Sequence, residues 1–131
     1  MQKLASDFAK TLIGGEVITL SGDLGFGKTT FIQGLAKGLG ITRRIISPTF
    51  ILSRSYSLFD KKIFYHIDLY RLQEGDAGEI LGLHEILHKP DTILAIEWPE
   101  RLGSHMPKKR IKIIFTYVDD TTRQITIQRR S

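Results

Sequence analysis

The chain has 131 residues, of which 41% are hydrophobic and 25% charged, and its formal net charge is +5. These values are ordinary for a globular protein, so we expect residues 1–131 to form a single domain. The absence of cysteine excludes disulfides, thiolate zinc sites and a cysteine nucleophile, and fits a cytoplasmic protein. No apolar run approaches the roughly 20 residues of a membrane span. The positive charge favours an anionic partner such as a nucleotide or RNA, but a solvated basic surface explains it equally well.

The first part of the chain reads as alternating helices and strands. Residues 3–12 carry apolar side chains four apart, which predicts an amphipathic helix ended by the glycine pair that follows. Residues 17–20 are apolar and β-branched, as in a buried strand. Residues 29–39 return to helical spacing, and Gly38 and Gly40 are expected to end this second helix.

The middle of the chain predicts a hairpin and then helical structure. Residues 49–58 and 62–70 are rich in aromatic and β-branched side chains, and residues 60–61 between them are typical of a turn. Residues 73–88 read as one or two short helices interrupted by a glycine.

The last third predicts strands. Residues 92–96 are continuously apolar, as in a strand buried on both faces. Residues 111–117 and 123–128 alternate and predict a second hairpin, whose acidic residues are better explained by a solvated turn than by a metal site. The order of elements predicts an α/β fold whose mixed sheet is flanked by helices. Its strands should be parallel around the centre and antiparallel at the margins.

Residues 22–29 read Gly-Asp-Leu-Gly-Phe-Gly-Lys-Thr and match the phosphate-binding loop Gly-x-x-x-x-Gly-Lys-[Ser/Thr]. Chance matches are rare in so short a chain, and this one follows a predicted strand and opens a predicted helix, as the motif requires. Its glycines let the backbone approach an anion closely. Lys28 would place its ammonium between the β- and γ-phosphates, and the Thr29 hydroxyl would bind Mg²⁺.

Nucleotide hydrolysis needs, besides the loop, a carboxylate for the metal, a group that positions water and a sensor of the γ-phosphate. Glu97 directly follows strand 92–96, at the strand end where open α/β folds bind their ligands. There it would face Thr29 across a Mg²⁺ ion. The alternative, which we weigh less, is a carboxylate that only caps the strand.

Asp68 and Thr49 are the candidates for the other two roles. Asp68 ends the strand predicted over residues 62–67, where it could orient the attacking water or hold a metal-bound water; a salt bridge to Arg71 is the equal alternative. Thr49 lies on a connection typical of switch loops, so its hydroxyl could meet the metal or the γ-phosphate. Turn chemistry around Pro48 is its alternative.

The histidines show no metal-ligand spacing, so we expect surface or packing roles for His66, His84, His88 and His105. Trp98 directly follows Glu97. It could stack on a base or a partner, and a core anchor is at least as good an explanation.

Four segments together resemble one family. Residues 22–30, 47–50 (Ser-Pro-Thr-Phe), 66–71 (His-Ile-Asp-Leu-Tyr-Arg) and 96–100 (Ile-Glu-Trp-Pro-Glu) are similar, in order and spacing, to TsaE (formerly YjeE). This family comprises bacterial ATPases of tRNA threonylcarbamoyladenosine synthesis. The resemblance spans nearly the whole chain, and the later segments are more specific to the family than the phosphate-binding loop.

The resemblance implies a P-loop fold, Mg-ATP binding and slow hydrolysis that depends on partners. The implied partner is the heterodimer that transfers threonylcarbamoyl to tRNA, with tRNA reached through that complex. It makes Lys28 and Thr29 the phosphate and Mg²⁺ residues, Glu97 the magnesium carboxylate and Asp68 the hydrolysis-linked aspartate, with Trp98 beside them. The nucleotide-binding set is then Gly25, Phe26, Gly27, Lys28, Thr29 and Thr30.

This sequence departs from the family pattern in two places. Phe26 replaces the usual alanine and makes the outer face of the loop bulkier. The counterpart of an early threonine near the nucleotide would fall at or before Met1. Two other functions stay open: a small metabolite kinase, which would need a lid, and a nucleotide-dependent RNA-binding adaptor. The motifs of a GTPase are absent.

Overall fold

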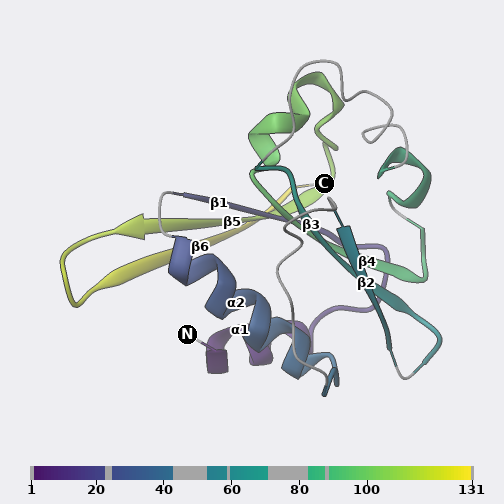
Figure 1. Ribbon diagram of the computed structural model, residues 1–131, viewed down its shortest axis with the longest axis horizontal. Helices are drawn as coiled ribbons and strands as arrows, with labels where there is room; N and C mark the ends of the chain where they lie inside the picture. Colours follow the sequence, from purple (N-terminus) through teal and green to yellow (C-terminus); the bar gives the residue numbers. More distant parts are fainter. Residues whose placement is uncertain are drawn as a thin grey trace.

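A six-stranded mixed sheet organises the computed structural model, which describes residues 2–22, 25–42, 53–58, 60–70, 83–87 and 89–130. The sheet lies between two helices on one side and short helical segments on the other (Figure 1). Residues 83–86 form one such helical turn. The other elements, in chain order, are α1 (Gln2–Ala9), β1 (Val17–Gly22), α2 (Gly25–Gly38), β2 (Ser53–Ser57), β3 (Ile63–Asp68), β4 (Thr92–Glu97), the 3₁₀ helix η1 (Pro99–His105), β5 (Arg110–Tyr117) and β6 (Arg123–Arg130).

The strand order β2-β3-β4-β1-β5-β6 confirms the predicted mixed sheet. β3, β4, β1 and β5 run parallel, whereas β2 and β6 add antiparallel strands at the two margins. All six residues of β4 are buried, as a continuously apolar run predicts for a strand covered on both faces. Both predicted hairpins form, one from β2 and β3 and the other from β5 and β6.

Two apolar clusters cover the two faces of the sheet. On the face of α1 and α2, Phe31 is fully buried; its ring lies 6.1 Å from Phe8 and 5.8 Å, edge to face, from Phe115. On the opposite face, Leu102 of η1 and Leu83 pack against side chains of the central strands β1 and β4. The sheet is therefore the middle layer of three.

Helices α1 and α2 approach each other closely because α2 presents two glycines to α1. A Cβ atom on Gly34 would lie 2.5 Å from the carbonyl oxygen of Gln2, and one on Gly38 would lie 2.7 Å from the Cβ of Ala9. The α2 helix ends as predicted near these glycines. The N–H of Ile41 donates to the carbonyl oxygen of Ala36, and the N–H of Gly40 donates to that of Lys37. With Gly40 at φ 89°, these two hydrogen bonds form a Schellman motif.

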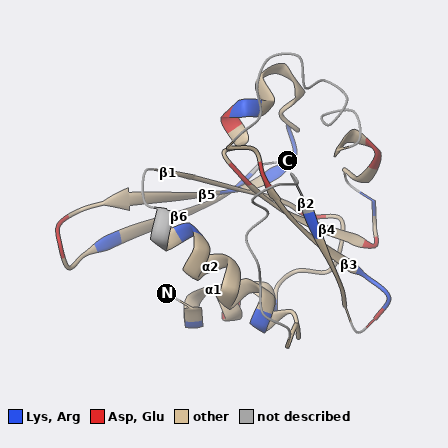
Figure 2. Ribbon diagram, viewed as in Figure 1, with Lys and Arg blue, Asp and Glu red and all other residues tan. Residues whose placement is uncertain are grey.

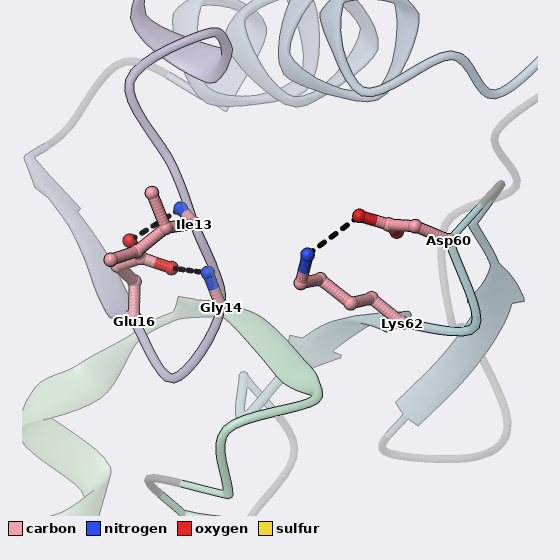
Figure 3. Close-up of polar contacts among 5 residues, drawn as sticks. All are labelled: Ile13, Gly14, Glu16, Asp60 and Lys62. Atoms are coloured by element: carbon pink, nitrogen blue, oxygen red, sulfur yellow. Dashed lines mark hydrogen bonds and ion pairs between the residues drawn. The ribbon is translucent and has the colours of Figure 1, made fainter.

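The α1 helix is shorter than predicted. It ends at Ala9, and only i→i+3 hydrogen bonds continue the turn as far as Leu12. The chain then reverses at Gly14, where φ is 118°, and the Glu16 carboxylate accepts the N–H groups of Ile13 and Gly14 at 2.8 and 2.7 Å (Figure 3). The local hydrogen bonds of Glu16 therefore shape the entry into β1.

One further difference concerns the start of a helix. The α2 helix begins at Gly25, four residues before the start predicted from apolar spacing, because glycines carry no apolar signal. Residues 71–82 and 49–52 lie outside the described residues, so most of the helical structure predicted over 73–88 and the start of the first predicted hairpin lie outside them too. The turn of that hairpin is described: Lys62 Nζ lies 2.6 Å from Asp60, as Figure 3 shows.

Charge is spread over several elements. Figure 2 shows Lys and Arg on helices, strands and turns, whereas the ribbon of the central strands is mostly uncharged. Within the described part of the chain, no helix is long and apolar enough to cross a membrane.

The glycine contact between α1 and α2 predicts that Gly34→Ala destabilises the protein, although this substitution usually stabilises a helix. Alanine favours a helix interior over glycine by roughly 0.5–1 kcal/mol, yet here its Cβ would meet the backbone of α1. We expect the free energy of unfolding to fall by about 1–3 kcal/mol, the usual effect of overpacking. Urea unfolding monitored by circular dichroism measures it. Lys37→Ala, at an exposed position of the same helix, is the matched control, and a Gly34→Ala protein as stable as this control would contradict the packing.

Candidate functional site

The candidate residues meet at the carboxyl ends of three neighbouring parallel strands. β1 leads through Gly22 toward α2, β3 ends at Asp68 and β4 ends at Glu97. In the strand register Glu97 is the partner of both Asp68 and Leu20. Because residues in register share a face, the two carboxylates lie on the face that α2 covers. The edge that binds ligands in open α/β folds thus carries both.

Gly22 is the residue of the motif whose backbone requires glycine. Its φ is 120°, and a Cβ atom there would overlap the carbonyl oxygen of Phe115 on β5. Gly25 and Gly27 instead lie within α2 and have ordinary helical backbone. The first turn of α2 therefore supplies N–H groups that have no partner within the helix, and its positive dipole end points the same way. This arrangement suits an anion.

Lys28 is buried at the start of α2, with 3% of its surface exposed. Its ammonium lies 4.6 Å from the centroid of the Trp98 ring, within the range of a cation–π contact. Tyr70 packs against the same indole at 5.1 Å, and the Arg101 guanidinium lies 5.9 Å from it. The indole therefore joins α2 to the ends of β3 and β4, and Lys28 is held without a carboxylate partner among the described residues.

Trp98 has an uncommon backbone conformation. Its φ of 57° and ψ of 50° are left-handed, which is rare for a bulky side chain and costs roughly 1–3 kcal/mol. The residue stands between Glu97 and Pro99, where the chain turns from β4 into η1. The indole is partly buried: it packs against the apolar cluster on the side of η1 and also contacts Lys28. The expected role as a core anchor is therefore met in part.

Glu97 is paired with a histidine that sequence reasoning assigned to packing or the surface. His66 Nε2 lies 2.7 Å from Glu97 Oε2, and the two residues are only 3% and 7% exposed. The second oxygen of Glu97 has no hydrogen bond to any described residue. The available signal was the spacing of His66 and Asp68, since residues two apart in a strand share a face.

Asp68 is half-buried, and its Oδ1 accepts the backbone N–H of Tyr70 at 3.0 Å. Burial raises its pKa above the usual 3.8, the nearby Glu97 carboxylate adds to this, and the Tyr70 hydrogen bond, His66 and Lys28 partly oppose it. The alternative partner, Arg71, lies outside the described residues. Ionised Asp68 thus occupies a site that disfavours its charge.

The remaining candidates are placed only in part. Thr29 is exposed on α2 and Thr30 is partly exposed. Thr49 and the side chain of Phe26 lie outside the described residues. Among the residues that are described, no three His, Asp or Glu side chains gather closely enough to hold a metal alone. One carboxylate with a free oxygen nonetheless suits Mg²⁺, which typically takes one or two carboxylates together with phosphates and water.

The raised pKa of Asp68 predicts that Asp68→Asn stabilises the ligand-free protein at neutral pH. A carboxyl whose folded pKa exceeds its unfolded value lowers stability as the pH rises from 3.8 through the folded pKa. Asparagine removes this charge and keeps an oxygen for the Tyr70 N–H. We expect a gain of at most about 1 kcal/mol, because solvent screens a half-exposed group.

Urea unfolding of both proteins across this pH range measures the effect. The gain should shrink as the pH falls through 3.8 and vanish well below it, where Asp68 is protonated in both the folded and the unfolded state. A variant less stable than the wild type at neutral pH would show that ionised Asp68 makes favourable contacts which outweigh its desolvation.

Comparison with known proteins agrees with this fold and these motifs. The profile of the family described as "Threonylcarbamoyl adenosine biosynthesis protein TsaE" matches residues 1–125. The tRNA threonylcarbamoyladenosine biosynthesis protein TsaE of Bacillus subtilis is 43% identical over 125 residues, covering 95% of this chain and 74% of its own. The TsaE protein of a Nostoc species is 45% identical over 124 residues, covering 90% and 73%.

A solved structure supports the same assignment. The crystal structure of YdiB from Bacillus subtilis superimposes with a TM-score of 0.79 at 34% sequence identity, covering 99% of this chain and 78% of that one. The profile match and the identity to curated relatives both extend over most of the chain. The chain therefore belongs to the TsaE family of tRNA threonylcarbamoyladenosine biosynthesis proteins.

Proposed function

We propose that this protein binds Mg-ATP at the edge where β1, β3 and β4 end, and hydrolyses the ATP in support of threonylcarbamoyladenosine synthesis on tRNA. The observation that carries the proposal is the buried Lys28 at the start of α2, close to the strand ends that bear Glu97 and Asp68. A cation buried without a carboxylate partner is costly. A bound polyphosphate would supply the close ion pair that Lys28 forms with no described carboxylate.

In this proposal the phosphates lie at the first turn of α2. The N–H groups of Gly25, Phe26, Gly27 and Lys28 bind them, and the helix dipole adds to the attraction. The Lys28 ammonium moves from the Trp98 ring to the β- and γ-phosphates, and Thr29 and Thr30 flank them with their hydroxyls. Binding therefore exchanges a cation–π contact for a stronger charge–charge contact.

Glu97 and Thr29 are the proposed Mg²⁺ ligands, and the ion would neutralise charge that develops on the transferring phosphoryl group. Asp68, next to Glu97 in the register, would orient the attacking water, and its raised pKa makes it a better proton acceptor than an ordinary aspartate. Thr49 would sense the γ-phosphate.

The proposed partner is the heterodimer that transfers threonylcarbamoyl to tRNA, with tRNA reached through that complex. Two features at the rim of the site support control by a partner. Tyr70 is 56% exposed although it packs on Trp98, and Asp68 is half-exposed beside it. A protein docking there would exclude water from Asp68 and complete the site, so slow hydrolysis by the isolated chain is expected.

Lys28→Ala tests the proposal. We expect ATP turnover, measured as phosphate release, to fall roughly 10²–10³-fold, because a positioned charge at the developing phosphoryl charge is lost. Lys37→Ala on the exposed face of the same helix removes an equal charge and should leave turnover unchanged. Both variants are assayed alone and with the heterodimer.

Three outcomes separate this proposal from its rivals. Equal turnover by wild type and Lys28→Ala would contradict hydrolysis at this site. Transfer of the γ-phosphate to a small metabolite would indicate a kinase. ATP binding without any turnover, even with the heterodimer, would indicate a nucleotide-dependent adaptor.

A further inference from the structure

The second ring nitrogen of His66 is buried and has no hydrogen-bond partner among the described residues. Nε2 lies 2.7 Å from Glu97 Oε2, whereas Nδ1 is inaccessible to solvent and makes no hydrogen bond to a described residue. An ionised carboxylate only accepts hydrogen bonds, so the proton of a neutral His66 resides on Nε2. Nδ1 is then an unprotonated acceptor to which no described residue donates.

A matching donor lies directly across the sheet. Arg54 on β2 pairs with His66 on β3 in the antiparallel register, which places their Cβ atoms roughly 4.5–5.5 Å apart on the same face. The neighbouring pair, Tyr56 and Phe64, confirms that this face is the one packed under α1 and α2. Arg54 Nε is also buried without a hydrogen-bond acceptor among the described residues.

The two orphan atoms are complementary, since guanidinium Nε–H only donates and the unprotonated Nδ1 only accepts. Buried polar groups in native proteins are almost always satisfied. A small rotation of the long Arg54 side chain, or one buried water between the atoms, would satisfy both. The other protonation states fit less well. A doubly protonated ring would leave Nδ1–H and Arg54 Nε–H as two buried donors without an acceptor among the described residues, and a neutral ring protonated on Nδ1 would have no donor for Glu97.

We propose that Arg54, His66 and Glu97 form a hydrogen-bonded chain in which His66 is a positioning residue. Arg54 Nε–H donates to His66 Nδ1, and His66 Nε2–H donates to Glu97 Oε2. The chain holds the Glu97 carboxylate in one orientation, with its other oxygen left for a ligand. The consequence for Mg²⁺ rests on the proposed function; the hydrogen-bonded chain itself does not.

Groups that orient a metal ligand usually change metal affinity about 10–100-fold when they are removed. The position of His66 in the sequence explains why it can play this role. It lies two residues before Asp68, so both side chains are on the same face of β3. His66 therefore reaches Glu97 from the side of the sheet interior, away from the strand ends. Arg54 lies one strand further out, on β2 at the margin of the sheet. It orients Glu97 only through His66.

The tautomer of His66 tests the chain without nucleotide. A long-range ¹H–¹⁵N spectrum distinguishes a protonated from a bare ring nitrogen, and His66→Gln identifies the signal among the four histidines. We expect the proton on Nε2 and a hydrogen-bonded Nδ1. Arg54→Met, which keeps the packing volume but removes the donor, should shift the Nδ1 resonance toward that of a free acceptor. A proton on Nδ1, or an unchanged Nδ1 signal in Arg54→Met, would overturn the chain.

Magnesium titration in the presence of ATP tests the consequence, with Trp98 fluorescence as the readout. We expect His66→Leu to weaken Mg²⁺ binding about 10–100-fold while ATP binding without Mg²⁺ is unchanged. His66→Gln retains a donor and should stay within a few-fold of wild type. Arg54→Met should weaken Mg²⁺ in the same direction but less, because the contact of His66 with Glu97 remains.

The results distinguish a failure of the proposed function from a failure of the positioning role of His66. A wild-type protein that binds no ATP contradicts the proposed function, and the tautomer measurement still decides the chain. A wild-type protein that binds Mg-ATP, with His66→Leu unchanged in Mg²⁺ affinity, contradicts the positioning role alone. If His66→Leu does not fold, which thermal unfolding shows, Arg54→Met and the wild-type tautomer decide.

Discussion

The parallel pairing of β1 with β4 is the contact on which the site depends. It places Leu20 beside Glu97, so the chain that continues from β1 into α2 begins next to the carboxylate that ends β4. On its other side β1 pairs with β5, whose backbone comes so close at Gly22 that no side chain fits there. One register therefore sets both where the loop begins and what it faces.

The site contains several features that, taken alone, lower the stability of the folded chain. Lys28, His66 and Glu97 are buried, burial raises the pKa of Asp68, and Trp98 has a left-handed backbone. Contacts offset part of the cost: Lys28 lies on the indole, and His66 pairs with Glu97. Elsewhere the core is apolar and well covered on both faces. Strain and buried charge concentrated at one edge are expected of a functional site.

Sequence patterns predicted the strands well because their signals are local. The continuous apolar run of β4 and the alternation of β5 depend only on which faces are covered, and both hairpins follow from short turns. Boundaries were predicted less well. The glycines at the start of α2 carry no apolar signal. After α1 ends at Ala9, turns with i→i+3 hydrogen bonds continue to Leu12, so the apolar spacing extends beyond the α-helix. The short helix η1 was missed because it depends on contacts with β1 and the core.

By itself, the sequence determined the strand–loop–helix motif, the mixed sheet and the carboxylates at the strand ends, since each follows from the spacing of residues along the chain. Only the tertiary structure decided that His66 contacts Glu97, that Arg54 lies opposite His66 and that Lys28 lies on Trp98. These contacts join residues far apart in the chain, and strand register together with one left-handed residue brings them together. Local patterns carry no information about register between distant strands, so the partners of the predicted site residues were not predictable from them.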